Sequence, residues 1–284
     1  MVLFEGIWFV AFVAGIIALT NWVNTKGYLI PFYNFLQKRI KSKRLLVALI
    51  SAVSGVLPIP GRTIISAGAL DTLAPNDDRR KNYGIINYLS THHYYLWSPL
   101  EATVLIPLSV LGISYFKFIS LIAPLLAIVI GVTIYYLFFV LKEEDVQINK
   151  IEKKASIAPM KWDVVFFVGL VIILGNTVKL YSDVILEFLL QYNTSIFFAG
   201  LIAFITSFIL GSSSKFAGIT TLLVSVFGIN YLPFLFSLGY SGYLISPMHK
   251  CLIITKKYFN LSMRLYLILL TISIALVTVG YLLV

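Results

Sequence analysis

The stretch GVLPIPGRTIISAG, residues 55–68, interrupts a strongly apolar chain with two prolines, three glycines and an arginine. The apolar arms on its two sides are each shorter than the roughly 20 residues that a helix needs to cross a bilayer. Non-helical backbone at membrane depth is tolerated where protein buries it or where it lines a wet cavity. We therefore predict a re-entrant helical hairpin over residues 45–70, with backbone breaks at Pro58 and Pro60.

The composition around this stretch is that of a membrane protein. Of the 284 residues, 59% are hydrophobic and 12% are charged, whereas soluble domains carry about 25% charged residues. We expect an all-α polytopic protein of the plasma membrane, whose partner is the lipid bilayer. The net charge of +10 indicates loops facing anionic lipid rather than a nucleic-acid partner. Apolar stretches of spanning length cover residues 4–23, 97–115, 117–141, 162–179 and 262–284.

Charge asymmetry predicts the orientation of these spans. The segment 24–44 holds six basic residues and no acidic one, which places it in the cytoplasm and the N-terminus outside. Counting spans forward also places the charged linker 142–161 in the cytoplasm. Residues 29–44 combine aromatic side chains with a basic end, a pattern typical of a helix lying in the membrane interface.

A second interruption repeats the first. GSSSKFAGIT (211–220) matches GRTIISAGAL (61–70) at its first glycine and at the Ala-Gly pair, and YLISP (243–247) matches YLWSP (95–99). The chain therefore divides into a first repeat, 1–141, and a second repeat, 162–284, joined by the linker. Each repeat contains a hairpin (45–70; 195–227), a segment interrupted at Ser-Pro (83–115; 231–259) and a final span (117–141; 262–284).

The number of crossings in the first repeat is odd, so the second repeat enters the membrane upside down. Inverted repeats with paired interrupted helices indicate a secondary transporter whose site lies near the bilayer midplane. The helices that follow the tips offer free N–H groups and a positive dipole end to an anion. The candidate substrate-binding residues are Gly61, Arg62, Thr63, Gly211, Ser212, Ser213, Ser214 and His249. The alternative is that the tips are packing kinks and that Arg62 reaches an interface.

The segment NYLSTHHYYLWSPLEAT (87–103) carries the candidate coupling residues Asn87, His92 and Glu101 beside the break at Pro99. An acidic residue at the start of an apolar run is costly, which favours a role in proton or sodium coupling. Two alternatives stay open for His92 and His93: an interfacial aromatic belt, or a metal site with Glu101. We assign no metal ligand and no cofactor other than a coupling sodium ion or proton. The single cysteine, Cys251, excludes an intramolecular disulfide and a cysteine cluster.

Three motifs resemble a prokaryotic integral-membrane family known as domain of unknown function 401. They are LPIPGR (57–62), NYLSTH (87–92) and SPMHKCLIITKKYF (246–259), the last including the break at Pro247. The family pattern has a second glycine where Arg62 stands and an arginine where Thr91 stands. The resemblance implies membership of the ion transporter superfamily, with gluconate, citrate and dicarboxylate carriers. Its members are elevator-type transporters, often dimeric, whose hairpin tips hold an anionic substrate.

The sequence thus predicts a secondary active transporter of a small organic anion, coupled to sodium or protons, and a homodimer by resemblance. One alternative is a flippase for a lipid-linked phosphate. A second is a membrane-embedded enzyme that uses His92, His93, Glu101 and His249. We expect no enzymatic activity, because no nucleophile and base stand at a recognisable spacing.

Overall fold

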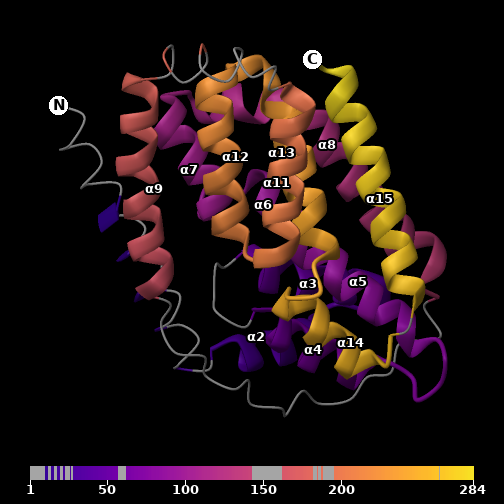
Figure 1. The fold of residues 1–284 in the computed structure, drawn as a ribbon. Helices are drawn as coiled ribbons and strands as arrows, with labels where there is room; N and C mark the ends of the chain where they lie inside the picture. The colour runs from indigo at the N-terminus through magenta and orange to yellow at the C-terminus, as the bar shows by residue number, and fades with distance from the viewer. Residues whose placement is uncertain are drawn as a thin grey trace.

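The computed structural model describes residues 28–56, 62–142, 162–181, 195–261 and 263–284, with isolated positions between 10 and 26 and at 184 and 187 (Figure 1). Every regular element within these residues is helical, so the prediction of an all-α chain is confirmed. The first half contains α2 (Leu29–Arg39), α3 (Lys43–Val56), α4 (Arg62–Leu73), α5 (Arg80–His92), α6 (Tyr94–Trp97), α7 (Ala102–Leu111), α8 (Tyr115–Tyr135) and the π-helical turn η1 (Tyr136–Val140). The second half contains α9 (Trp162–Leu180), α11 (Ile196–Leu210), α12 (Ser213–Phe227), the 3₁₀ turn η3 (Ile229–Tyr231), α13 (Leu232–Ile245), α14 (Lys250–Phe259) and α15 (Met263–Leu282).

Two of the described helices are long and apolar enough to cross a membrane. One is the 26-residue run Tyr115–Val140, formed by α8 and η1, and the other is the 20-residue α15. At a rise of about 1.5 Å per residue, these helices span about 39 and 30 Å, against a hydrocarbon core of about 30 Å. Shorter apolar helices include α11 and α12, with 15 residues each.

Local chemistry explains where several helices begin and end. The Ser114 and Ser195 side chains accept hydrogen bonds from the backbone N–H groups of Lys117 and Phe198, capping α8 and α11. Gly112 ends α7 and Gly211 ends α11, both in the left-handed conformation that glycine adopts without a Cβ penalty.

The predicted span 97–115 forms a shorter helix than expected. The chain breaks after Trp97, and α7 has only 10 residues, Ala102–Leu111, with Gly112 as its C-cap residue. The Ser-Pro pair at residues 98–99 explains the break, since proline cannot donate the backbone hydrogen bond and disfavours helical geometry in the residue before it. The second Ser-Pro pair separates α13 from α14 in the same manner.

The two halves show the same pattern of helix contacts. α3 and α4 pack against each other and against α5, while α11 and α12 pack against each other and against α13. Contacts also cross between the halves, since α4 packs on α14 and α12 packs on α7. In Figure 1, α4 and α14 lie side by side at the bottom of the view, and α12 lies beside α7 at the top. The core is therefore shared by both halves.

Candidate functional site

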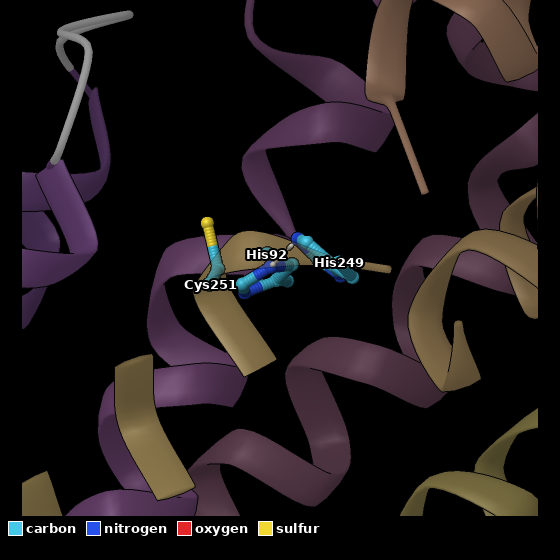
Figure 2. Close-up of side chains that lie close together, drawn as sticks. All are labelled: His92, His249 and Cys251. Carbon is cyan, nitrogen blue, oxygen red and sulfur yellow. Dashed lines mark hydrogen bonds between the residues drawn. The ribbon is translucent and has the colours of Figure 1, made fainter. Parts of the chain in front are cut away.

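The candidate site lies where the end of α5 meets the start of α14. His92 is the last residue of α5, and His249 is the N-cap residue of α14. Their side chains are buried, with 1% and 2% of their surface exposed, and their Nε2 atoms lie 3.2 Å apart. Figure 2 shows the two imidazoles side by side with Cys251, which lies on the first turn of α14. Because α5 belongs to the first half and α14 to the second, the site joins the two halves.

Tyr88 fixes the orientation of His92. The backbone carbonyl of Tyr88, one turn earlier on α5, lies 2.6 Å from His92 Nδ1. A carbonyl can only accept, so Nδ1 carries the proton of this hydrogen bond. In the neutral imidazole, Nε2 therefore presents a lone pair toward His249. The Tyr88 ring stacks on the imidazole, with a distance of 3.9 Å between the ring centroids.

The hydroxyl of Tyr88 fixes the orientation of His249. This hydroxyl donates to the Leu244 carbonyl at 2.7 Å and lies 3.0 Å from His249 Nδ1. Since its proton is directed to the carbonyl, the hydroxyl oxygen accepts from Nδ1–H of His249. Nε2 of the neutral His249 then also presents a lone pair. The two Nε2 atoms lie 3.2 Å apart, at hydrogen-bonding distance in a buried site, so a shared proton or a cation between them would satisfy both nitrogens.

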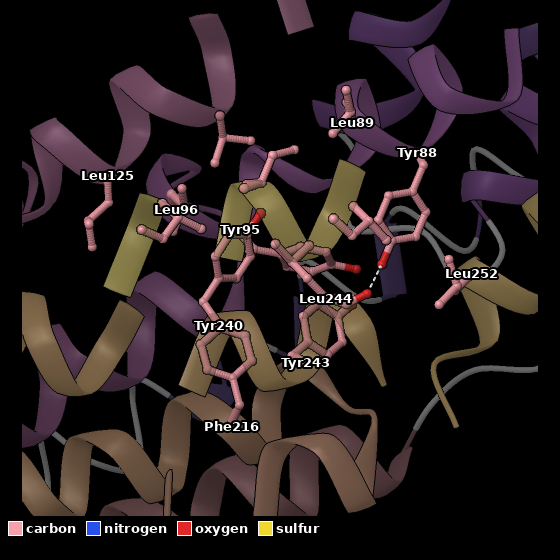
Figure 3. Packing of buried hydrophobic residues seen from close by; sticks show 14 of the residues in the cluster. Tyr88, Leu89, Tyr95, Leu96, Leu125, Phe216, Tyr240, Tyr243, Leu244 and Leu252 are labelled. Atoms are coloured by element: carbon pink, nitrogen blue, oxygen red, sulfur yellow. Dashed lines mark hydrogen bonds between the residues drawn. The ribbon is translucent and has the colours of Figure 1, made fainter. Parts of the chain in front are cut away.

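Aromatic side chains enclose this pair. The ring of Tyr243 lies 4.1 Å from that of His249, and the Tyr95 ring meets the ring of His92 edge-on at 5.4 Å. Tyr240 donates its hydroxyl to the His92 carbonyl at 2.9 Å. Figure 3 shows Tyr88, Tyr95, Tyr240 and Tyr243 gathered in one buried cluster. The two imidazoles therefore sit in a low-dielectric environment, which strengthens any interaction with a charge.

The break between α11 and α12, the predicted second tip, contacts this site directly. Gly211 ends α11 with a φ of 54°, and an added Cβ would lie 2.7 Å from the Met248 carbonyl carbon and 2.8 Å from the His249 nitrogen. The Ser246 hydroxyl donates to the Phe208 carbonyl at 2.5 Å. This hydrogen bond links the break between α13 and α14 to the last turn of α11. Hence the structure brings Gly211, Pro247 and His249 together.

The remaining residues of the second tip follow at the start of α12. Ser212 precedes the helix, and its hydroxyl lies 3.4 Å from that of Ser214. Ser213 is the first residue of α12 and is partly exposed, whereas Ser214 is 5% exposed. Lys215 is partly exposed on the same turn. The tip therefore presents hydroxyl groups and one ammonium-bearing side chain at a helix N-terminus.

Part of the first tip lies outside the described residues. This holds for Pro58, Pro60 and Gly61 and for the side chain of Arg62, whose backbone begins α4. Thr63 is buried, and its hydroxyl has no hydrogen-bond partner among the described residues. Ser66, one turn further on α4, is also buried, and its hydroxyl also has no hydrogen-bond partner among the described residues. Buried hydroxyls of this kind require an explanation, such as water or a bound ligand.

The predicted coupling residues occupy different positions around the break. Asn87 is buried on α5 and donates to the Thr255 hydroxyl at 3.3 Å, while its carbonyl oxygen Oδ1 has no described partner. Glu101 is the N-cap residue of α7 and is 6% exposed, with Pro99 exposed nearby. His93 points elsewhere, since its Nδ1 accepts from Trp97 Nε1 at 3.0 Å. His93 is therefore half-buried beside Trp97, whereas His92 is 1% exposed in the cluster with His249.

Sequence reasoning missed Tyr88 and Cys251 as members of this site. Tyr88 stands four residues before His92, and Cys251 stands two residues after His249. An i, i+4 relationship on a helix puts two side chains on one face, which was the available signal for Tyr88. The proximity of Cys251 to His92 depends on the packing of α14 on α5, which the sequence does not reveal.

Comparison with known proteins identifies one match. Residues 8–156 match the profile of a family described as "Protein of unknown function (DUF401)". The matched range contains NYLSTH and ends before the SPMHKCLIITKKYF segment. No curated protein and no solved structure matches the chain.

Proposed function

The chain belongs to the DUF401 family, and we propose that it is a secondary active transporter of a small organic anion, similar to carriers of the ion transporter superfamily. In this proposal the two halves are inverted repeats, and α3–α4 and α11–α12 are re-entrant hairpins. The protein is multi-pass in the plasma membrane, with the segment 24–44 and the linker 142–161 in the cytoplasm. Transport proceeds by an elevator-type movement within a homodimer.

The observation that carries the proposal is the position of the second tip. Gly211 packs against the broken segment at Met248 and His249, and His249 in turn contacts His92 of the first half. Interrupted helices from both halves thus meet in one buried polar region. Transporters with inverted repeats place their sites at such a meeting of discontinuous helices. The match over residues 8–156, which ends within the linker, agrees with a first half that forms a unit.

An anionic substrate is favoured by the groups near the tips. None of the helices α4, α12 and α14, which begin at the interruptions, has an acidic residue in its first turn. Their N-termini therefore offer unopposed dipole ends, which attract anions. Arg62 begins α4, and Lys215 stands in the first turn of α12. An arginine suits a carboxylate because its guanidinium can donate two parallel hydrogen bonds.

A coupling cation, sodium or a proton, would use polar groups of α5 and the first Ser-Pro break. The buried candidates are Oδ1 of Asn87 and the carboxyl group of Glu101. Amide and carboxylate oxygens are hard ligands that suit a sodium ion, and a carboxylate can instead accept a proton.

Uptake into proteoliposomes tests the proposal. Vesicles containing the purified protein receive labelled mono-, di- and tricarboxylates under an imposed sodium or pH gradient, and a thermal-shift screen adds phosphates to the same panel. We expect one class of carboxylate to accumulate only with one gradient, and the same class to raise the melting temperature. Protein that accumulates no carboxylate under either gradient, and is stabilised only by phosphates, would overturn the assignment and favour a phosphate ligand.

A further inference from the structure

We propose that His92, His249 and Cys251 form a site for a borderline-soft transition-metal ion of the zinc class, with a fourth coordination position open. This inference goes beyond transport and does not depend on it. One ligand atom from each residue lies within 4.8 Å of the others, and the two histidines are buried (Figure 2).

The distance between the two imidazoles fits shared coordination. Zn–N bonds of 2.0–2.1 Å at a tetrahedral angle put two ligand nitrogens about 3.3 Å apart. The Nε2 atoms of His92 and His249 are 3.2 Å apart. The same geometry puts a thiolate sulfur about 3.5 Å from each nitrogen, so the group, now spread over up to 4.8 Å, contracts slightly when the ion binds.

The hydrogen bonds around the imidazoles prepare both Nε2 atoms as ligands. Metal-binding histidines commonly donate the other ring N–H to a carbonyl or another acceptor, which fixes the tautomer and the ring orientation. Here Nδ1 of His92 donates to the Tyr88 carbonyl, and Nδ1 of His249 donates to the Tyr88 hydroxyl. A cation placed between the two Nε2 atoms replaces their hydrogen bond with two coordinate bonds.

The donor set selects the class of ion. Imidazole and thiolate ligands favour zinc, cobalt and copper, whereas magnesium and calcium take oxygen ligands. Cys251 is partly exposed and not disulfide-bonded, and Pro247 and Met248, immediately before the site, are exposed. The chain immediately before the buried His249 therefore lies at the protein surface.

Metal titration of the full-length protein in detergent tests the inference. We expect one Zn²⁺ per chain by equilibrium dialysis and elemental analysis, with no competition from excess Mg²⁺. Co²⁺ bound at the same site should show the intense visible absorption of tetrahedral cobalt and a thiolate-to-cobalt charge-transfer band. The His249→Ala and His92→Ala variants should each lose at least tenfold in Zn²⁺ affinity, and Cys251→Ser should lose the charge-transfer band.

His93→Ala is the matched control, because His93 is adjacent in sequence and bonds to Trp97 instead. Its Zn²⁺ affinity should equal that of the original protein. Equal affinities in His93→Ala and His249→Ala, or a cobalt spectrum without a thiolate band, would overturn the site. The cobalt spectrum of the unsubstituted protein and of Cys251→Ser decides the question even if a histidine variant fails to fold.

Discussion

Tyr88 Oη and His249 Nδ1 lie 3.0 Å apart, although 161 residues separate them in the sequence. The same hydroxyl donates to the Leu244 carbonyl, so a single oxygen on α5 bonds to two residues of the second half. The contact is buried at both ends. It makes Tyr88 a direct link between α5, the end of α13 and the start of α14.

Replacement of Tyr88 by phenylalanine should destabilise the protein. The change removes one oxygen and leaves the Leu244 carbonyl and His249 Nδ1–H without this partner in a buried site, at a cost of about 1–3 kcal/mol. The melting temperature of the purified protein, followed by circular dichroism, measures the effect. Tyr281→Phe, at an exposed position on α15, is the control. Equal melting temperatures in the two variants would show that the hydroxyl of Tyr88 does not contribute.

Gly211→Ala should be strongly destabilising. The φ of 54° disfavours alanine, and the added methyl group would meet backbone atoms of Met248 and His249 at 2.7–2.8 Å. Left-handed strain and overpacking together cost about 2–4 kcal/mol. Gly131→Ala on α8, where nothing lies within 4 Å of the added methyl group, should instead be neutral or stabilising by up to about 1 kcal/mol. Thermal unfolding of both variants checks this difference in sign.

Arg80→Ala should cost more stability than Arg79→Ala. Arg80 forms an ion pair with Asp71, whose side chain is 9% exposed, and its guanidinium lies over the Phe259 ring of α14. Loss of this contact removes one charged partner of a largely buried carboxylate, at a cost of about 2 kcal/mol. Arg79 pairs with exposed Asp77, and exposed pairs contribute about 0–1 kcal/mol. Equal losses in the two variants would contradict a structural role for Arg80 between the halves.

Alkaline conditions should weaken the contact between α2 and α3. Burial raises the pKa of Tyr33 from 10.0 to about 12, and its hydroxyl lies 2.6 Å from the Ser54 hydroxyl. Because the folded pKa exceeds the unfolded one, this contribution to stability is complete below pH 10 and is lost as the pH rises toward about 12. Melting temperatures measured across this interval should fall more steeply for the original protein than for Tyr33→Phe. Parallel curves would contradict the assignment to Tyr33.

Arg62→Ala should abolish binding of the transported anion while the protein remains folded. The residue begins α4 at the first tip, where its guanidinium would supply two hydrogen bonds to a carboxylate. The measurement is the ligand-induced rise in melting temperature together with uptake. Lys117→Ala, in the first turn of α8, is a control for the loss of a positive charge. Unchanged affinity in Arg62→Ala would leave Arg62 as an interfacial anchor.

Much of the helical pattern could be predicted from residue types. Proline after serine at residues 98–99 and 246–247, and glycine at residue 211, are local signals, and helices end at each of them. Local signals act within one turn of the chain, so they predict breaks without predicting what the breaks contact. The shortness of α7 shows this limit, because hydropathy registers the apolar residues on both sides of Pro99 as one span.

The composition of the site was harder to predict, because its members come from elements that are distant in sequence. His92 and His249 were recognised separately as polar residues near breaks, yet their contact depends on how α14 packs on α5. Cys251 carried no signal of its own, since a cysteine in an apolar chain is an ordinary core residue, and the only signal for Tyr88 was its i, i+4 spacing to His92. Periodicity within one helix reports its faces, but the partner of each face is a property of the tertiary fold.

The crossed packing of α4 on α14 and of α12 on α7 has a consequence for biosynthesis. When the ribosome has completed the first half, α4 lacks the helix that packs on it. The face of α4 that contacts α14 therefore stays uncovered until residue 259 has been synthesised. The first half alone should therefore be a target for membrane proteases. Two separate polypeptides divided within the linker, once co-expressed, should protect each other by assembling into the complete protein.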